Sequence, residues 1–356
     1  MGFRHDFERM AVKAVGKKAH EALSAKRFQL DDIWNIFGVN TEFFIKKCLS
    51  RPVTLNFHPD RCSKNGRLVL ENLLSDGVYL SQFHTGTSNG GLTAHIGGER
   101  FLWEQRLFSG IYPADTPDRP KYGALNLFHY LDGASARFGS CYFVLNPAVL
   151  PRCTFAYGDS SSDPDVLCTW DSFELIAEAL LWDLFQKHRI LDREGCDPLQ
   201  GLSVLLGDPV PRVRGNLDFC IEVHIHGELS LLEDIDSLFL DESYRDTETE
   251  RIAISLCRRY HIALGWIPKR EIAVSQIEDS FRGPLVPLLA HRADSLTGGH
   301  GVMNAALIGR AAQSSVRFPT LWEDLGDAFA LFQAFKQLWH TVAFFGTNPR
   351  RKLLFL

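Results

Sequence analysis

"VTLNFHPDRC", residues 53–62, predicts a short buried strand that ends in a tight turn. The stretch follows Pro52, which has no amide hydrogen to donate and disfavours helical backbone in the residue before it. Its first five residues are mostly apolar, β-branched or aromatic, which is typical of a strand. The Pro-Asp pair that follows is favoured in type I turns. The strand therefore presents His58 and Arg61 at its end.

A second interpretation of the same stretch is a J-domain co-chaperone, whose signature His-Pro-Asp turn matches residues 58–60. In a J-domain the turn follows a long basic helix. Here that helix would have to run through Pro52, and an internal proline costs a helix about 3 kcal/mol. The strand is the favoured interpretation, and a non-catalytic interaction protein of the J-domain type stays as an alternative.

Composition indicates an ordinary globular protein. The 356 residues are 45% hydrophobic and 23% charged, and the formal net charge of −5 argues against a nucleic-acid partner. The sequence has no apolar run of 18 residues, so no membrane span is expected. The eight cysteines include no C-x-x-C pair, which argues against zinc ribbons and favours free thiols in a reducing compartment. We expect a cytoplasmic protein, or one exported as an effector or toxin.

The chain divides into three parts by pattern. Residues 1–50 have helical periodicity, with one helix expected from about residue 4 to 24 and a further pair before residue 50. Residues 51–300 contain short apolar runs separated by glycine, and residues 301–356 are again helical and aromatic. Strands and helices do not alternate strictly, and neither G-x-G-x-x-G nor a P-loop is present. The pattern predicts an α+β fold with helices packed at both ends.

The segment "CIEVHIHG", residues 220–227, predicts another strand. Side-chain alternation puts two sets on opposite faces: Ile221, Val223 and Ile225 on one, and Cys220, Glu222, His224 and His226 on the other. The second set has three possible meanings. It is a solvated strand face, a metal site in which His224 and His226 are joined by His58 or a carboxylate, or a cleft floor on which Glu222 is a catalytic carboxylate.

Three polar loops are candidates to complete such a cleft. "FHTGTSNGG", residues 83–91, sets hydroxyl and amide side chains among glycines, which allow close backbone approach to a ligand. "RPKYGALN", residues 119–126, offers an arginine, a lysine, a tyrosine and an asparagine, and "AYGDSSSDPD", residues 156–165, offers Asp159, Ser160 and Ser161. Their polar groups suit an amide, a ribose and phosphates, although the same residue types are common in ordinary loops.

Six motifs together resemble a family of bacterial and fungal proteins known only as a domain of unknown function. The resemblance spans about residues 51–260 and rests on "NFHPDR", "QFHTGTSNGGLTA", "RPKYGALN", "RFGSCYFVLNP", "CTFAYGDS" and "IEVHIHG". The family name implies no activity.

The order of the same motifs also resembles the ADP-ribosyltransferases, which share a split β-sandwich. In that superfamily an Arg or His ends the first strand, a Ser-Thr-Ser-like segment follows, and a glutamate lies on a late strand. Here Gly-Thr-Ser stands at 86–88, and Cys220 stands where a Glu or Gln would indicate arginine-directed transfer.

The superfamily resemblance implies that NAD is the substrate and that ADP-ribose is transferred to a protein or another macromolecule without a metal. It implies these roles: NAD binding by His58, Arg61, Thr87, Ser88, Asn89 and Tyr122, and catalysis by Glu222. The carboxylate would stabilise the oxocarbenium-like transition state, Arg61 would pair with a phosphate, and Tyr122 would stack on the nicotinamide.

Overall fold

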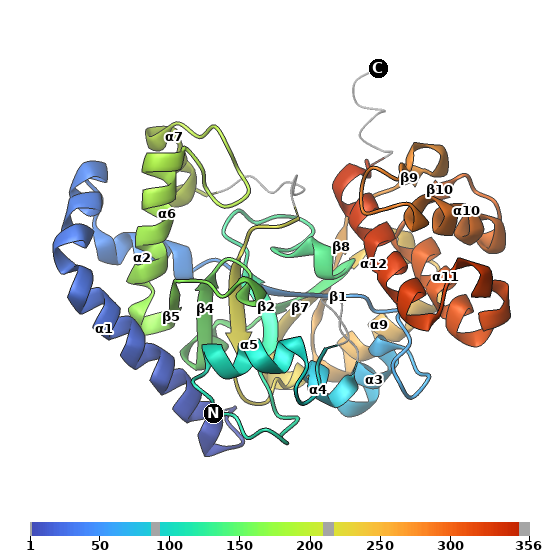
Figure 1. Cartoon of the computed structure of the whole chain (residues 1–356), viewed down its shortest axis with the longest axis horizontal. Helices are drawn as coiled ribbons and strands as arrows, with labels where there is room; N and C mark the ends of the chain where they lie inside the picture. The colour runs from blue at the N-terminus through green and yellow to red at the C-terminus, as the bar shows by residue number, and fades with distance from the viewer. Residues whose placement is uncertain (1, 87–92, 209–216, 349–356) are drawn as a thin grey trace.

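The computed structural model describes residues 2–86, 93–208 and 217–348. In this part of the chain an eight-stranded sheet has the order β5-β4-β6-β2-β1-β3-β7-β8 (Figure 1). The strands are β1 (Val53–Phe57), β2 (Lys121–Leu125), β3 (Cys141–Leu145), β4 (Cys153–Tyr157), β5 (Leu167–Thr169), β6 (Ile221–Ile225), β7 (Ile235–Asp241) and β8 (Ala263–Ile267). Neighbouring strands are antiparallel except the parallel pair β7 and β8. The α+β fold and the strands expected at 53–57 and 220–227 are confirmed.

The two N-terminal helices and two helices from the middle of the chain pack at the β5 end of the sheet. They are α1 (Asp6–Phe37), α2 (Thr41–Leu49), α6 (Glu174–Lys187) and α7 (Pro198–Leu206). The prediction that the first helix ends near residue 24 is wrong, because α1 continues through the segment expected to start a second helix. No glycine or proline interrupts residues 17–37, and the helix ends at Gly38, which adopts the left-handed conformation (φ 60°) that glycine tolerates best.

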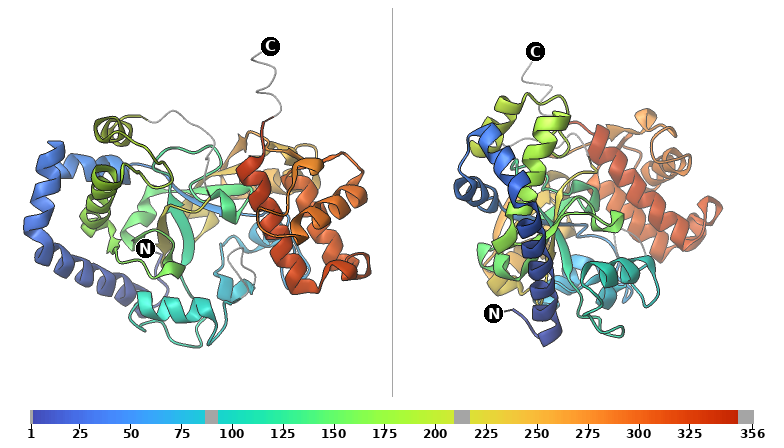
Figure 2. Two further views of the ribbon diagram at one scale, coloured as in Figure 1. Left: turned by 45° about the horizontal axis from the view of Figure 1, so that its top comes forward. Right: turned by 60° about the vertical axis from the view of Figure 1, so that its left-hand side comes forward.

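A second helical group packs at the other end of the molecule, as the turned views also show (Figure 2). It consists of α10 (Leu285–Thr297), α11 (Ala305–Arg317) and α12 (Ala328–Phe345), which pack on one another. The helical segment expected from residue 301 thus packs as a unit with α10. The indole N–H of Trp339 donates to the Ala136 carbonyl at 2.8 Å and fixes α12 to the sheet domain.

Five further helices connect strands of the sheet: α3 (Val69–Asp76), α4 (Gln82–Thr85), α5 (Glu99–Leu107), α8 (Leu231–Asp234) and α9 (Glu248–Tyr260). A two-stranded sheet of β9 (Ile272–Ala273) and β10 (Val302–Met303) lies beside α10. Within the described ranges, no helix combines the length and the apolar character needed to cross a membrane.

The sheet opens between β1 and β2. These strands pair only at Val53 and Thr54, whereas the other edge of β1 pairs with β3 as far as Phe57. Gly123 lies where the strands diverge, and a Cβ on it would stand 2.7 Å from the Thr54 carbonyl oxygen. Any larger residue at position 123 would therefore push β2 away from β1 at Thr54. Beyond Thr54, the side of β1 that faces β2 is free to line a cavity.

Candidate active site

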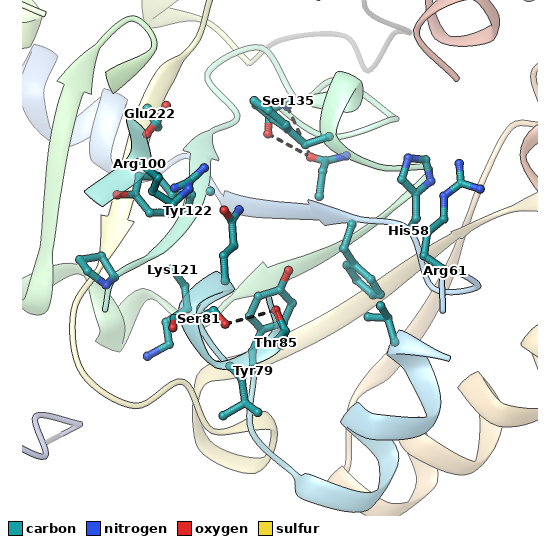
Figure 3. A pocket seen from close by; sticks show the side chains of 18 of the residues that line it. His58, Arg61, Tyr79, Ser81, Thr85, Arg100, Lys121, Tyr122, Ser135 and Glu222 are labelled. Atoms are coloured by element: carbon teal, nitrogen blue, oxygen red, sulfur yellow. Dashed lines mark hydrogen bonds between the residues drawn. The ribbon is translucent and has the colours of Figure 1, made fainter. Parts of the chain in front are cut away.

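A cavity of about 310 Å³ lies at the opening between β1 and β2 (Figure 3). Its wall comes from β1, β2 and β6, from the first turn of α5, from α3 and α4, and from the two short 3₁₀ helices at Ala136–Phe138 and Ser160–Ser162. The volume is in the range of sites for small molecules and cofactors. Segments far apart in the sequence therefore meet here.

Of the seven residues that the superfamily resemblance assigns to the site, four line this cavity: His58, Arg61, Tyr122 and Glu222. Figure 3 shows Tyr122 and Glu222 on one side of the cavity and His58 and Arg61 on the other. The other three predicted residues, Thr87, Ser88 and Asn89, lie outside the described residues. The cavity-lining residues nearest to them in the sequence are Thr85 on one side and Thr93 on the other.

The Glu222 carboxylate is held in place by the 3₁₀ turn that follows β4. The hydroxyl of Ser160 donates to Oε1 at 2.6 Å, and its backbone N–H donates to Oε2 at 3.2 Å. The Nε2 atom of His224 lies 3.1 Å from the same Oε1. The residue is 7% exposed, so this is a buried, oriented carboxylate at the cavity wall. Ser160 was a sequence candidate only as part of a polar loop.

Tyr122 does not present a free ring to the cavity. Its hydroxyl donates to Glu104 Oε1 at 2.7 Å, and the Arg100 guanidinium carbon lies 4.5 Å from its ring centroid. Arg100 covers one face of the ring that was expected to stack on nicotinamide. Arg100 is not a candidate from the sequence alone, because a charged residue on an amphipathic helix has no local pattern that marks it as part of a site.

His58 and Arg61 are joined to the C-terminal helices. Burial lowers the pKa of His58 well below its usual value, and the nearby positive charge of Arg61 adds to this effect, so the imidazole is neutral. Its ring meets the Trp339 ring edge-on at 5.4 Å between centroids. Arg61 donates from Nη1 to the Ile308 carbonyl at 3.3 Å. This end of the cavity is therefore shaped by α11 and α12, which sequence patterns could not place.

The His-Pro-Asp triplet lacks the context of a J-domain. It follows strand β1 instead of a helix, and Asp60 is only 2% exposed. The Asp60 carbonyl accepts a hydrogen bond from Gln313 on α11 at 3.1 Å. Burial raises the pKa of the Asp60 carboxyl to about 6. A triplet covered in this way offers no surface to a chaperone partner.

The polar face of β6 is not solvated, contrary to one of the sequence interpretations. His224 and His226 are both 0% exposed, covered by Phe108, whose ring meets each imidazole edge-on. The Thr154 hydroxyl lies 2.9 Å from His224 Nδ1 and 3.0 Å from His226 Nε2, and the Tyr112 hydroxyl lies 2.7 Å from His226 Nδ1.

The fourth imidazole nitrogen, His224 Nε2, faces Glu222. Both ring nitrogens of His224 and of His226 therefore face a protein group. Across the described ranges, no group of three or more His, Cys, Asp or Glu side chains is arranged to hold a metal ion. The histidine pair has the contacts of a structural network.

Two further cations line the cavity. Lys121 is buried, its ammonium group donates to the Gly227 carbonyl at 2.5 Å, and burial lowers its pKa to about 8. Arg137 forms ion pairs with Asp159 and with Asp218, the latter at 3.3 Å. The cavity therefore has a mixed polar wall in which most charged groups have a protein partner.

Comparison with known proteins identifies a family without an activity. No curated protein matches the chain. A family model matches residues 52–345, which extends the expected range of 51–260 through α12. The match begins one residue before β1 and includes each element that lines the cavity. The chain belongs to the family described as protein of unknown function (DUF3626).

Proposed function

We propose that this protein transfers the ADP-ribosyl group of NAD to a protein or another macromolecule. The observation that carries the proposal is that His58, Arg61, Tyr122 and Glu222, from three separate segments, line one cavity. The opening between β1 and β2 is the feature most like the split β-sandwich of ADP-ribosyltransferases. A fold relationship to that superfamily is part of the proposal.

The shape of the cavity suits an extended ligand. Glu222, Ala124 and Thr54 form one row across β6, β2 and β1. Glu222 and Thr54 are two strand spacings apart, which is roughly 10 Å across the sheet. His58 lies four residues after Thr54, which is roughly 13 Å along the strand direction. A dinucleotide could place its reactive ribose near Glu222 and its other nucleoside near His58.

The proposed chemistry needs no further reagent. The bond between C1′ of the ribose and the nicotinamide nitrogen breaks, and nicotinamide leaves with the bonding electron pair. A nucleophile of the acceptor forms the new bond to C1′ and loses a proton. Positive charge develops on the ribose in the transition state, and the Glu222 carboxylate, already fixed by Ser160, would stabilise it without reorganisation.

Labelled NAD tests this function. Purified protein is incubated with NAD carrying label in the adenylate part, with and without cell lysate, and both macromolecular label and free nicotinamide are measured. Glu222→Gln removes the negative charge and keeps the shape, so we expect transfer to fall by about 10²- to 10³-fold. Glu233→Gln makes the same chemical change at an exposed position of helix α8 and is the control. Wild-type protein that neither binds NAD nor releases nicotinamide would refute the proposal.

A further inference from the structure

Helix α5 places one arginine at the cavity wall beside the predicted reaction centre. Arg100 is in the first turn of this helix, is 6% exposed and lines the cavity. Its backbone N–H donates to the Thr93 hydroxyl at 3.3 Å, which fixes the start of the helix. Figure 3 shows Arg100 beside Tyr122 and on the same side of the cavity as Glu222.

Aromatic rings hold the Arg100 guanidinium in a defined orientation. Its central carbon lies 4.5 Å from the Tyr122 ring centroid and 4.7 Å from that of Trp103. Such contacts favour a cation but satisfy none of its N–H donors in the plane of the guanidinium. Among the described residues, Nη1 has no hydrogen-bond acceptor, although it is buried.

The carboxylate nearest to Arg100 among the described contacts, that of Glu104, already binds other groups. Glu104 Oε1 lies 3.9 Å from Arg100 Nη1, beyond hydrogen-bond distance, and accepts from the Tyr122 hydroxyl at 2.7 Å. Its other oxygen accepts from Arg119 Nη1 at 3.3 Å, and the Arg119 side chain is itself fully buried. One carboxylate thus faces two buried guanidinium groups. A buried cation whose donors are not satisfied is costly unless a ligand completes its contacts.

We propose that Arg100 binds a phosphate group of the substrate. The inference rests on the proposed function, and it moves the phosphate contact from Arg61, where the sequence suggested it, to α5. Arg61 already donates to a carbonyl and lies on the side of the cavity away from Glu222. A guanidinium presents parallel N–H donors that match phosphate oxygens.

Two features near Arg100 favour an anion. The N-cap of α5 is Gly98, so the one side-chain acceptor shown for the first turn is the Thr93 hydroxyl, and the amino end of a helix carries partial positive charge. The Arg100 charge also offsets the negative Glu222 on the same side of the cavity. A phosphate-bearing molecule could therefore enter a site that contains a buried carboxylate.

Calorimetric titration with a set of ligands tests the inference. The probes are inorganic pyrophosphate and ADP-ribose, which carry phosphates, and nicotinamide, which does not. In Arg100→Gln we expect the affinity for both phosphate-bearing probes to fall about 10- to 100-fold, the effect of losing hydrogen bonds to a charged group. Nicotinamide binding should change less than about twofold. Arg100→Lys keeps the charge but loses the paired donors, and we expect an intermediate loss.

Arg106→Gln is the matched control, because Arg106 is an exposed arginine on the same helix and does not line the cavity. It should bind each probe like the wild-type protein. Thermal unfolding of all variants checks that the fold is retained. Equal losses for nicotinamide and ADP-ribose in both Arg100 variants would indicate a structural role of the stacked guanidinium and overturn the proposal.

The outcomes separate this inference from the proposed function. If Arg100→Gln binds ADP-ribose and NAD as tightly as the wild type, the phosphate contact is refuted while NAD turnover stands on its own test. If wild-type protein binds pyrophosphate through Arg100 but does not bind or cleave NAD, the phosphate site is supported with another phosphate-bearing substrate, and the transferase is refuted. If the wild-type protein binds neither probe with phosphates, the phosphate contact is refuted, and the labelled-NAD experiment alone decides the transferase.

Discussion

The two ends of strand β6 present polar side chains on the same face but to different surroundings. Glu222 lies at the cavity wall, and two residues further His224 and then His226 lie beneath Phe108 and are completely buried. At the buried end each imidazole nitrogen faces a protein group. At the cavity end a neighbouring donor, Arg100 Nη1, has no acceptor among the described residues.

A structural polar network and a ligand site differ in how their polar groups are hydrogen-bonded. Burial alone does not separate them, because both ends of the strand are almost entirely buried. Complete hydrogen bonding of groups that do not line a cavity indicates a network that stabilises the fold, whereas an unsatisfied donor at a cavity wall indicates a place for a ligand. The two ends should therefore respond differently to substitution, one in stability and the other in activity.

The largest expected effect is on stability at the buried end. His226→Ala removes the partner of the Tyr112 hydroxyl, deprives the Thr154 hydroxyl of one contact and leaves a cavity. We expect the free energy of unfolding to fall by about 3 kcal/mol. Urea denaturation of the variant and of wild-type protein measures the difference.

Glu222→Gln is the comparison for this experiment and should change the free energy of unfolding by less than about 1 kcal/mol, because the amide oxygen can still accept from Ser160. A smaller loss in His226→Ala than in Glu222→Gln would contradict the division of the strand. Stabilisation of wild-type protein by zinc, lost in His226→Ala, would instead restore the metal interpretation of the histidine pair.

The second prediction concerns pH. Burial lowers the pKa of His226 well below its usual value, and the charges of His224, Lys121 and Arg152 add to the effect. In the unfolded chain the pKa is about 6.5, so below that pH the unfolded state takes up a proton that the folded state does not. The stability due to neutral His226 is therefore complete above pH 6.5 and is lost as the pH falls.

Unfolding experiments at pH 7.5 and 5.5 isolate this contribution when wild-type protein is compared with His226→Gln. Linkage predicts that the wild-type protein loses about 1 kcal/mol more than the variant between these two values. Glu222→Gln serves again as the comparison and should lose as much as the wild type. Identical pH dependence of wild-type protein and His226→Gln would show that His226 is not held neutral in the folded state.

Sequence patterns could predict much of the fold and part of the site. There is a physical reason why they could not predict the rest. Strands β1 and β6 were found because their apolar runs and alternation are local properties, and His58, Arg61 and Glu222 followed from where these strands place them. Alternation identifies the face on which a side chain lies. It does not identify what covers that face, which depends on contacts distant in sequence.

Arg100 illustrates what local patterns miss. Its position depends on how α5 packs over Tyr122, a contact between segments that no spacing rule connects. The same holds for α12, whose Trp339 packs against His58 and whose Phe332 lines the cavity. The length of α1 was underestimated for a different reason, because helix ends depend on stop signals and no glycine or proline occurs between residue 24 and Gly38.

The smallest expected effect is at the cavity end and concerns the orientation of Glu222. Ser160→Ala removes the hydroxyl that donates to Oε1 at 2.6 Å but keeps the backbone N–H that donates to Oε2. The carboxylate keeps its charge and becomes less firmly oriented, so we expect nicotinamide release from NAD to slow by about five- to tenfold, less than the loss in Glu222→Gln. The free energy of unfolding should fall by no more than about 1 kcal/mol.

Ser162→Ala is the matched control, since Ser162 belongs to the same 3₁₀ turn but is exposed and does not line the cavity. Its rate of nicotinamide release should equal that of wild-type protein. The rate of nicotinamide release and the free energy of unfolding together show whether a residue acts at the site or in the structural network. A substitution at Ser160 that weakened folding strongly and left the rate per folded molecule unchanged would place Glu222 in the structural network with the histidines, and the catalytic role would have to be withdrawn.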